Sequence, residues 1–143
     1  MKNTAIPTED SEQAMLFTWA RMQEAAHPEL RLMYAIPNGG YRHLKTAINL
    51  KRTGVKAGVP DICLPVKRGT YNGLYVEMKR TVGGTVSSYQ KWWLAELAKA
   101  GHKCVVCKGF DEARAAIMAY LMGDKCLHDG TDMSVAAGLV EEE

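Results

Sequence analysis

The sequence predicts an α/β fold in which a central mixed sheet is flanked by helices, in three layers. The first observation is that stretches with a helical apolar period alternate with stretches that have a strand-like apolar pattern. The second is their order: helix, strand, helix, two strands joined by a turn, helix, strand, helix. That order favours a sheet covered on both faces. The third is the length of 143 residues, which suits one domain with its own core.

The first helix is expected from Thr8 to about Ala26. Thr8 is a suitable N-cap, and acidic residues fill the first turn, where negative charge complements the helix dipole. Glu12 begins the apolar stripe that continues through Leu16 and Trp19. The carboxylate of Glu12 is therefore expected to point inward.

The middle of the chain is expected to hold most of the sheet. Residues 30–36 predict a short strand, which ends at the turn residues 37–40, and residues 43–52 predict a basic helix. Residues 59–66 form an apolar strand, and residues 73–80 alternate well enough to be its hairpin partner.

The last elements are a helix, a strand and a helix. Ser87 or Ser88 is expected to cap a helix that runs to about Ala100, followed by a short buried strand over 104–107 and an amphipathic helix over 111–121. The apolar periodicity then fades. The sequence predicts one domain over residues 8–122 and a loosely structured tail over 123–143.

Composition indicates a folded protein of the cell interior. Hydrophobic residues make up 47% of the chain and charged residues 24%, which excludes a mostly disordered chain. No stretch reads as a signal peptide or a membrane span, so a cytoplasmic location without membrane contact is expected. The four cysteines have no regular spacing and are expected to be reduced thiols. A zinc site of Cys104, Cys107, Cys126 and His128 is the less favoured alternative.

The charge distribution favours a polyanionic partner. Between Leu30 and Lys108 there are 14 lysine or arginine residues and three acidic residues, which gives this part a net charge of +11. The whole chain carries +2, so the two flanks together carry −9. A basic body of this kind is typical of proteins that bind phosphate backbones.

Two of the three acidic residues of the basic body lie in the expected hairpin. Asp61 follows Pro60 at the start of the first strand, and Glu77 and Lys79 lie in the second. Glu77 and Lys79 point to the same face because strand side chains alternate, and the Met78 carbonyl is left as a further possible ligand. Converging carboxylates bind Mg²⁺ or Mn²⁺, and a lysine offers positive charge during phosphodiester hydrolysis. The alternative is a structural ion pair between Glu77 and Lys79.

These segments resemble the PD-(D/E)xK nuclease superfamily, and within it the VRR-NUC family of virus-type replication-repair nucleases. The resemblance rests on GVPDICLPV at residues 58–66, LYVEMKR at 74–80 and SSYQKWW at 87–93, and spans about 11–121. It implies a restriction-endonuclease-like core and a nuclease that uses Mg²⁺ or Mn²⁺. Among family members, the chain is similar to the stand-alone phage and bacterial ones.

The resemblance also implies the roles of the site residues. Glu12, Asp61 and Glu77 would bind the metal, Lys79 would orient the attacking water or stabilise the transition state, and Gln90 would support this arrangement. The stand-alone members look similar to resolvases of branched DNA, which implies a homodimer that cuts structures such as Holliday junctions. Of the adjacent Trp92 and Trp93, one is expected in the core and the other at a dimer interface.

DNA contacts are expected from the segment between the first strand and the hairpin. The turn at residues 37–40 contains an asparagine and two glycines, which allow the backbone to approach DNA closely. Several basic residues follow the turn, and no acidic residue occurs between Arg31 and Pro60. The expected DNA-binding residues are Asn38, Gly39, Gly40, Arg42, Lys45, Lys51, Arg52 and Lys56. The competing functions are a non-catalytic DNA-binding or recruitment module, a flap or restriction-type nuclease, and a basic protein-interaction domain.

Overall fold

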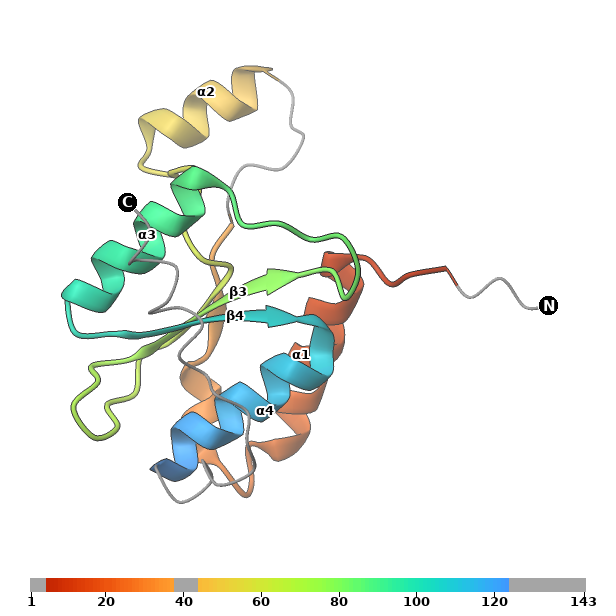
Figure 1. Ribbon diagram of the computed structural model, residues 1–143, viewed down its shortest axis with the longest axis vertical. Helices are drawn as coiled ribbons and strands as arrows, with labels where there is room; N and C mark the ends of the chain where they lie inside the picture. Colours follow the sequence, from red (N-terminus) through yellow and green to blue (C-terminus); the bar gives the residue numbers. More distant parts are fainter. Residues whose placement is uncertain (1–4, 38–43, 124–143) are drawn as a thin grey trace.

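The computed structural model describes residues 5–37 and 44–123. These residues form a mixed sheet with helices on both sides, as Figure 1 shows. In chain order the elements are α1 (Glu9–Gln23), the 3₁₀ helix η1 (Pro28–Leu32), β1 (Tyr34–Ala35), α2 (Leu44–Arg52), β2 (Ile62–Leu64), β3 (Leu74–Lys79), α3 (Ser88–Lys99), β4 (Lys103–Lys108) and α4 (Gly109–Met122).

The sheet has four strands in the order β1-β2-β3-β4. β2 pairs with β1 and with β3 in antiparallel fashion, and β3 pairs with β4 in parallel. At the centre, Val76 of β3 lies between Ile62 of β2 and Val105 of β4. The antiparallel pairing of β2 with β3 confirms the expected hairpin, and the parallel pairing of β3 with β4 makes the sheet mixed, as expected. Helix α3 supplies the crossover connection that a parallel pair requires.

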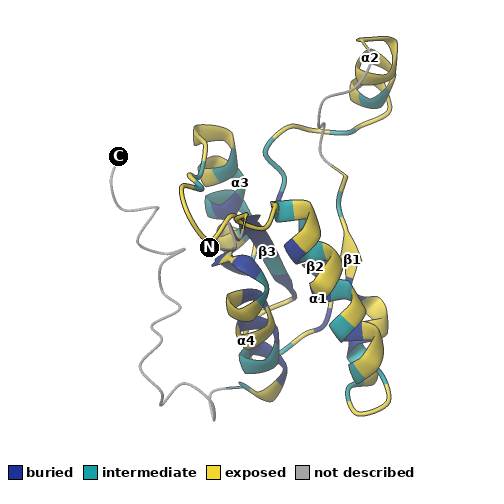
Figure 2. Cartoon of the chain, turned by 90° about the vertical axis from the view of Figure 1, so that its right-hand side faces the viewer, coloured by how far each residue is buried: buried dark blue, intermediate teal, exposed yellow. Residues whose placement is uncertain are grey.

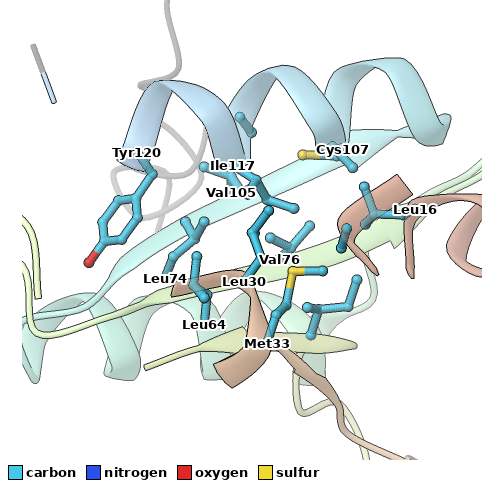
Figure 3. Packing of buried hydrophobic residues seen from close by; sticks show 14 of the residues in the cluster. Leu16, Leu30, Met33, Leu64, Leu74, Val76, Val105, Cys107, Ile117 and Tyr120 are labelled. Atoms are coloured by element: carbon cyan, nitrogen blue, oxygen red, sulfur yellow. The ribbon is translucent and has the colours of Figure 1, made fainter. Parts of the chain in front are cut away.

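Helices α1 and α4 cover one face of the sheet, and α3 lies on the other. Leu16 of α1 and Ile117 of α4 are fully buried in one cluster with Val76, Met78 and Val105, part of which Figure 3 shows. Removing these apolar side chains from water is the main force that holds the two helices on the sheet. The three-layer arrangement predicted by the order of elements is confirmed.

Two serine or threonine caps fix the starts of helices at the predicted places. The Thr8 hydroxyl accepts a hydrogen bond from the Ser11 N–H at 3.1 Å, and Ser87 forms a capping box with Gln90. Each cap satisfies an N–H that has no partner inside the helix. The end of α1 differs from the prediction, because the helix stops at Gln23 rather than near Ala26.

The prediction of a strand over residues 30–36 is wrong for its first half. Pro28 begins a 3₁₀ helix that runs to Leu32, and only Tyr34 and Ala35 pair with β2. Proline fixes φ at a value that suits the first turn of a helix. Leu30 is the buried residue of that turn, so its apolar character signals packing rather than a strand.

Helix α2 has no buried residue and stands away from the sheet, as Figure 2 shows. It confirms the basic helix predicted before the hairpin. The turn residues Asn38, Gly39 and Gly40, together with Arg42, lie outside the described residues, as does the predicted tail from residue 124 onward.

The cysteines that the structure describes are free and buried: Cys63, Cys104 and Cys107. Cys126 and His128, which the zinc alternative requires, lie outside the described residues. Within residues 5–37 and 44–123, no helix has the length and apolar character needed to cross a membrane.

Candidate active site

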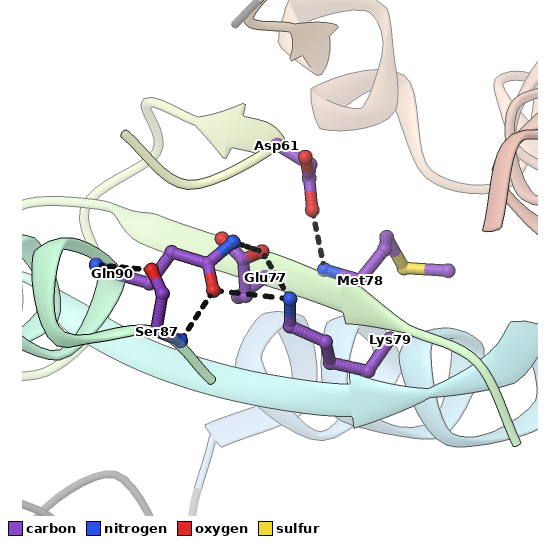
Figure 4. A network of polar contacts seen from close by, with 6 residues as sticks. All are labelled: Asp61, Glu77, Met78, Lys79, Ser87 and Gln90. Atoms are coloured by element: carbon purple, nitrogen blue, oxygen red, sulfur yellow. Dashed lines mark hydrogen bonds and ion pairs between the residues drawn. The ribbon is translucent and has the colours of Figure 1, made fainter. Parts of the chain in front are cut away.

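Asp61 lies at the end of the sheet where the β1–β2 pairing begins. Its carbonyl accepts a hydrogen bond from the Ile36 N–H at 2.7 Å, which continues the pairing past β1. Its side chain reaches across the hairpin, and Oδ2 accepts a hydrogen bond from the Met78 N–H at 2.7 Å (Figure 4). The buried Pro60 precedes it and limits the backbone at this position. The Asp61 carboxylate therefore lies beside the last residues of β3.

Glu77 and Lys79 project from β3 toward α3, as the alternation of the strand predicts. The two residues are 1% and 7% exposed, and Lys79 Nζ lies 3.5 Å from Glu77 Oε1. Met78, between them, points to the opposite face and packs in the core. Two ionisable side chains are therefore buried side by side at one end of an otherwise apolar strand.

Gln90 joins these two side chains from the first turn of α3. Its Nε2 donates to Glu77 Oε1 at 2.7 Å, and its Oε1 accepts from Lys79 Nζ at 3.0 Å. The same oxygen accepts from the Ser87 N–H at 2.9 Å, which is half of the capping box (Figure 4). The local rule that starts α3 also fixes the orientation of the Gln90 amide, and this amide holds Glu77 and Lys79 in place.

Asp61 and Glu77 act on each other in opposite directions: Asp61 raises the pKa of Glu77, whereas a hydrogen bond with Glu77 lowers the pKa of Asp61. Burial raises the pKa of Glu77 to about 8, and the neighbouring Asp61 charge contributes in the same direction against the opposing effect of Lys79. Burial also raises the pKa of Asp61, which the Met78 N–H partly offsets. In the absence of a cation, the pair therefore retains protons at a higher pH than isolated carboxyl groups do.

A divalent cation fits the donors at this position. Glu77 Oε2 is buried and has no hydrogen-bond partner, although its neighbour Oε1 has two polar contacts. A buried carboxylate oxygen without a partner is costly, and the nearby Asp61 charge adds to the cost. Hard oxygen donors with this excess of negative charge are the ligands that Mg²⁺ or Mn²⁺ prefers. The donors of Asp61 and Glu77 are therefore chemically suited to a divalent cation.

Glu12 is inward-facing, as predicted, but its carboxylate contacts the start of α4 rather than Asp61 or Glu77. It is 7% exposed, and its Oε2 accepts a hydrogen bond from the Phe110 N–H at 2.6 Å at the start of α4. Gly109 has a φ of +84°, and a Cβ at this position would lie 3.5 Å from the Glu12 carboxylate and 2.6 Å from Thr81 Cγ2, so this turn requires glycine.

The predicted ligand set of three carboxylates is not assembled. Within the described residues, no three acidic, histidine or cysteine side chains converge to hold a metal. Asp61 and Glu77 lie together, whereas the Glu12 carboxylate is held at the start of α4. The metal role of Glu12 stays a prediction.

Glu9 is an acidic residue whose position in the sequence suggested only a role at the helix dipole. Its charge acts on Asp61 and contributes to the raised pKa of that carboxyl group. The first turn of α1 therefore lies within electrostatic reach of the site. The sequence carries no signal for this effect beyond the place of Glu9 in the first turn of α1.

The described basic residues of the predicted DNA-binding set are all exposed. Lys45, Lys51 and Arg52 lie on α2, and Lys56 lies in the segment that leads from α2 back to Asp61. Arg52 contacts Asn49 on its own helix and makes no ion pair with any described residue. The structure places this charge on the segment that leads to the site, and the DNA contacts themselves stay a prediction.

Comparison with known proteins agrees with this fold. The sequence model of the VRR-NUC domain matches residues 6–111. A solved structure titled "VRR_NUC domain protein" is 32% identical, with a TM-score of 0.71, over 82% of this chain and 91% of that chain. No curated protein matches the chain. The fold and the match together define a nuclease-type domain that acts on DNA. The chain belongs to the VRR-NUC domain family, which confirms the resemblance found in the sequence.

Proposed function

We propose that the protein is a divalent-metal-dependent endonuclease that hydrolyses DNA phosphodiester bonds. The observation that carries this proposal is the buried, unpartnered Glu77 Oε2 beside Asp61, on a strand whose next residue on the same face is Lys79. A non-catalytic DNA-binding domain has no need to bury two repelling carboxylates, because their burial costs stability without adding to a binding surface.

Asp61 and Glu77 would hold the ion, which is Mg²⁺ or Mn²⁺, with the Met78 carbonyl as a further ligand. A strand residue directs its N–H and C=O to the same side, and the Met78 N–H is directed to Asp61. Glu12 is the proposed third carboxylate. Because its Oε2 accepts from Phe110, its Oε1 would be the ligand atom. When bound, the ion would supply an acidified water and neutralise charge on the phosphate.

Lys79 and Gln90 would organise the attack on phosphorus. Lys79 Nζ is held by Gln90 Oε1 and by Glu77 Oε1, so its charge is fixed before substrate binds. From this position it orients the attacking water or stabilises the negative charge that develops on the phosphate oxygens. Gln90 acts through Glu77 and Lys79 and is a positioning residue. Fixed donors of this kind avoid reorganisation during the reaction.

For the substrate, we propose branched DNA such as Holliday junctions, cut by a homodimer. This part is supported by the resemblance of the chain to stand-alone members of its family. It is also supported by the exposed basic residues next to the site, which suit a substrate with several phosphate backbones. The alternatives are a flap or restriction-type nuclease and a non-catalytic recruitment module, and each predicts a different cleavage pattern.

The test compares labelled four-way junction, flap, splayed and linear duplex DNA, with Mg²⁺, Mn²⁺ or EDTA. We expect the wild type to cut junctions symmetrically with either metal and to cut nothing in EDTA. Asp61→Ala and Lys79→Ala should bind but not cut, and Lys67→Ala, an exposed lysine outside the site, should cut normally. The catalytic proposal fails if the wild type cuts no substrate or if the site variants cut as it does. A monomer mass by light scattering at micromolar concentration would exclude the homodimer.

A further inference from the structure

A groove of about 1140 Å³ runs between α2 and α3. Its lining includes Leu50 and Lys51 of α2, Lys56 of the segment that follows α2, and Tyr89 and Trp92 of α3. In Figure 1, α2 lies above the N-terminal part of α3. The groove is therefore formed by a helix that stands away from the sheet and by the helix that carries Gln90.

The α3 side of the groove presents two aromatic side chains to solvent. Tyr89 is 68% exposed and Trp92 is 57% exposed, and a separation of three residues places them next to each other on the helix. Trp92 contacts Trp93 edge to face, with ring centroids 5.4 Å apart. The Trp93 Nε1–H donates to the Ala57 carbonyl at 3.0 Å, which fixes that ring. The exposed Trp92 ring thus rests on a rigid support.

The charge of the groove complements a phosphate backbone. Lys51 and Lys56 line it, Lys91 is exposed on the same turn of α3, and none of the described residues that line it is acidic. Flat aromatic faces combined with lysines form the two parts of a surface that binds unpaired nucleic-acid strands. The bases stack on the rings and the phosphates pair with the cations.

The groove is continuous with the candidate active site. Gln90 lines the groove and also contacts Glu77 and Lys79. The segment after Lys56 is pressed against α3, because a Cβ at Gly58 would lie 2.7 Å from Tyr89 Cβ, and this segment leads directly to Asp61. A strand in the groove would therefore run into the proposed metal site.

We propose that this groove binds an unpaired DNA strand, with bases on Tyr89 and Trp92 and phosphates at Lys51 and Lys56. The inference rests on the proposed function in taking DNA as the substrate. It deepens that function by predicting a preference for DNA in which a segment beside the scissile bond is unpaired or becomes unpaired on binding. Paired bases in a duplex hide the faces that such rings recognise. A second copy of the chain as the occupant is an alternative that the test below distinguishes.

The test measures binding in EDTA, so that no cleavage occurs. Fluorescence anisotropy would compare a 12-nucleotide thymidine strand, an abasic strand of equal length and a 12-base-pair duplex. We expect the wild type to bind the thymidine strand at least about tenfold more tightly than the abasic strand. Trp92→Ala should lose this preference and keep its duplex affinity, whereas Trp92→Phe should retain most of it. Tyr71→Ala, an exposed tyrosine outside the groove, is the matched control and should behave as wild type.

The inference is overturned if the wild type shows no preference for bases over abasic sites, or if Trp92→Ala retains it. An equal loss of strand and duplex affinity in Trp92→Ala also overturns it, since that indicates a general defect. If the wild type sediments as a dimer and Trp92→Ala as a monomer, the groove is an interface between copies and the inference is wrong. A wild type that prefers bases but cuts no DNA would keep the groove and remove the nuclease proposal. A wild type that cuts DNA but does not prefer bases over abasic sites would keep the nuclease proposal and remove the groove proposal.

Discussion

The Asp61 carboxylate is tied to the backbone of the residue that separates Glu77 from Lys79. Its Oδ2 accepts the Met78 N–H at 2.7 Å, so the end of one strand of the hairpin is fixed against the end of the other. This single hydrogen bond explains how a residue 16 positions earlier in the chain comes to repel Glu77. A substitution at position 61 that keeps a side-chain oxygen would preserve this hydrogen bond.

Asp61→Asn should separate the structural and the metal-binding roles of this side chain. Asparagine keeps an oxygen that can accept the Met78 N–H, so the melting temperature in EDTA should not fall. The lost negative charge should lower Mn²⁺ affinity and reduce cleavage by at least about 100-fold. Calorimetric titration with Mn²⁺ and a junction-cleavage assay check both effects. A variant that cuts at the wild-type rate would show that Asp61 is not a ligand.

Lys79→Met should abolish cleavage while leaving DNA and metal binding nearly intact. Methionine has a similar length and suits a buried position, but it carries no charge to stabilise the phosphate in the transition state. We expect kcat to fall by about 100-fold or more with little change in KM. Lys67→Met, at an exposed position away from the site, serves as the control. A rise in KM with kcat unchanged would assign Lys79 to substrate binding instead.

Gln90→Ala should lower kcat by about tenfold to 100-fold without removing metal binding, because the amide that aligns Lys79 with Glu77 is removed. One half of the capping box, the hydrogen bond from the Ser87 N–H to Gln90 Oε1, is removed as well, which should cost about 1 kcal/mol of unfolding free energy. Ser87→Ala is the matched comparison, since it removes the cap and keeps the Gln90 amide. Equal kinetic losses in the two variants would mean that capping, rather than alignment, explains the effect.

The raised pKa of Glu77 predicts how stability depends on pH. Folding moves this pKa from its usual 4.5 to about 8, so in this window the folded chain holds a proton that the unfolded chain releases. The free energy of unfolding in EDTA should therefore fall as pH rises from about 4.5 to about 8. Glu77→Gln should flatten this dependence and exceed the wild type at pH 8 by about 1 kcal/mol or more, roughly 3 °C in melting temperature.

Mg²⁺ provides the control for that experiment. The ion should stabilise the wild type at pH 8 and leave Glu77→Gln almost unchanged, since binding requires the ionised carboxylate. Urea melts at several pH values, with and without Mg²⁺, measure both effects. A wild type whose stability rises over this window in EDTA would contradict the burial of an ionisable Glu77.

The basic segment predicts a salt dependence of DNA binding. Replacing Lys51, Arg52 and Lys56 by glutamine should weaken binding to all DNA forms. The slope of log affinity against log salt should shrink by about one unit for each cation that no longer pairs with a phosphate. These residues are exposed, so the melting temperature should not change. Anisotropy in EDTA over a range of salt concentrations measures the slope. An unchanged slope would move the DNA contacts to another surface.

Features set by neighbouring residues were predictable from the sequence. The caps at Thr8 and Ser87, the hairpin and the pairing of Glu77 with Lys79 on one face follow from local turn chemistry and strand alternation. The inward direction of Glu12 also followed from helical spacing. The error at residues 30–32 arose because a short apolar run has the same appearance in a 3₁₀ turn and in a strand.

The sequence by itself determined the family, the order of the elements and the candidate residues for the chemistry, because these depend on spacings of a few residues. Only the tertiary structure decided that Glu12 contacts the start of α4 and that Gln90 bridges Glu77 and Lys79. It also decided that α2 leaves a groove beside α3. Each of these depends on how separate helices pack on the sheet, and the burial of apolar side chains that drives this packing has no direction that a local pattern could reveal.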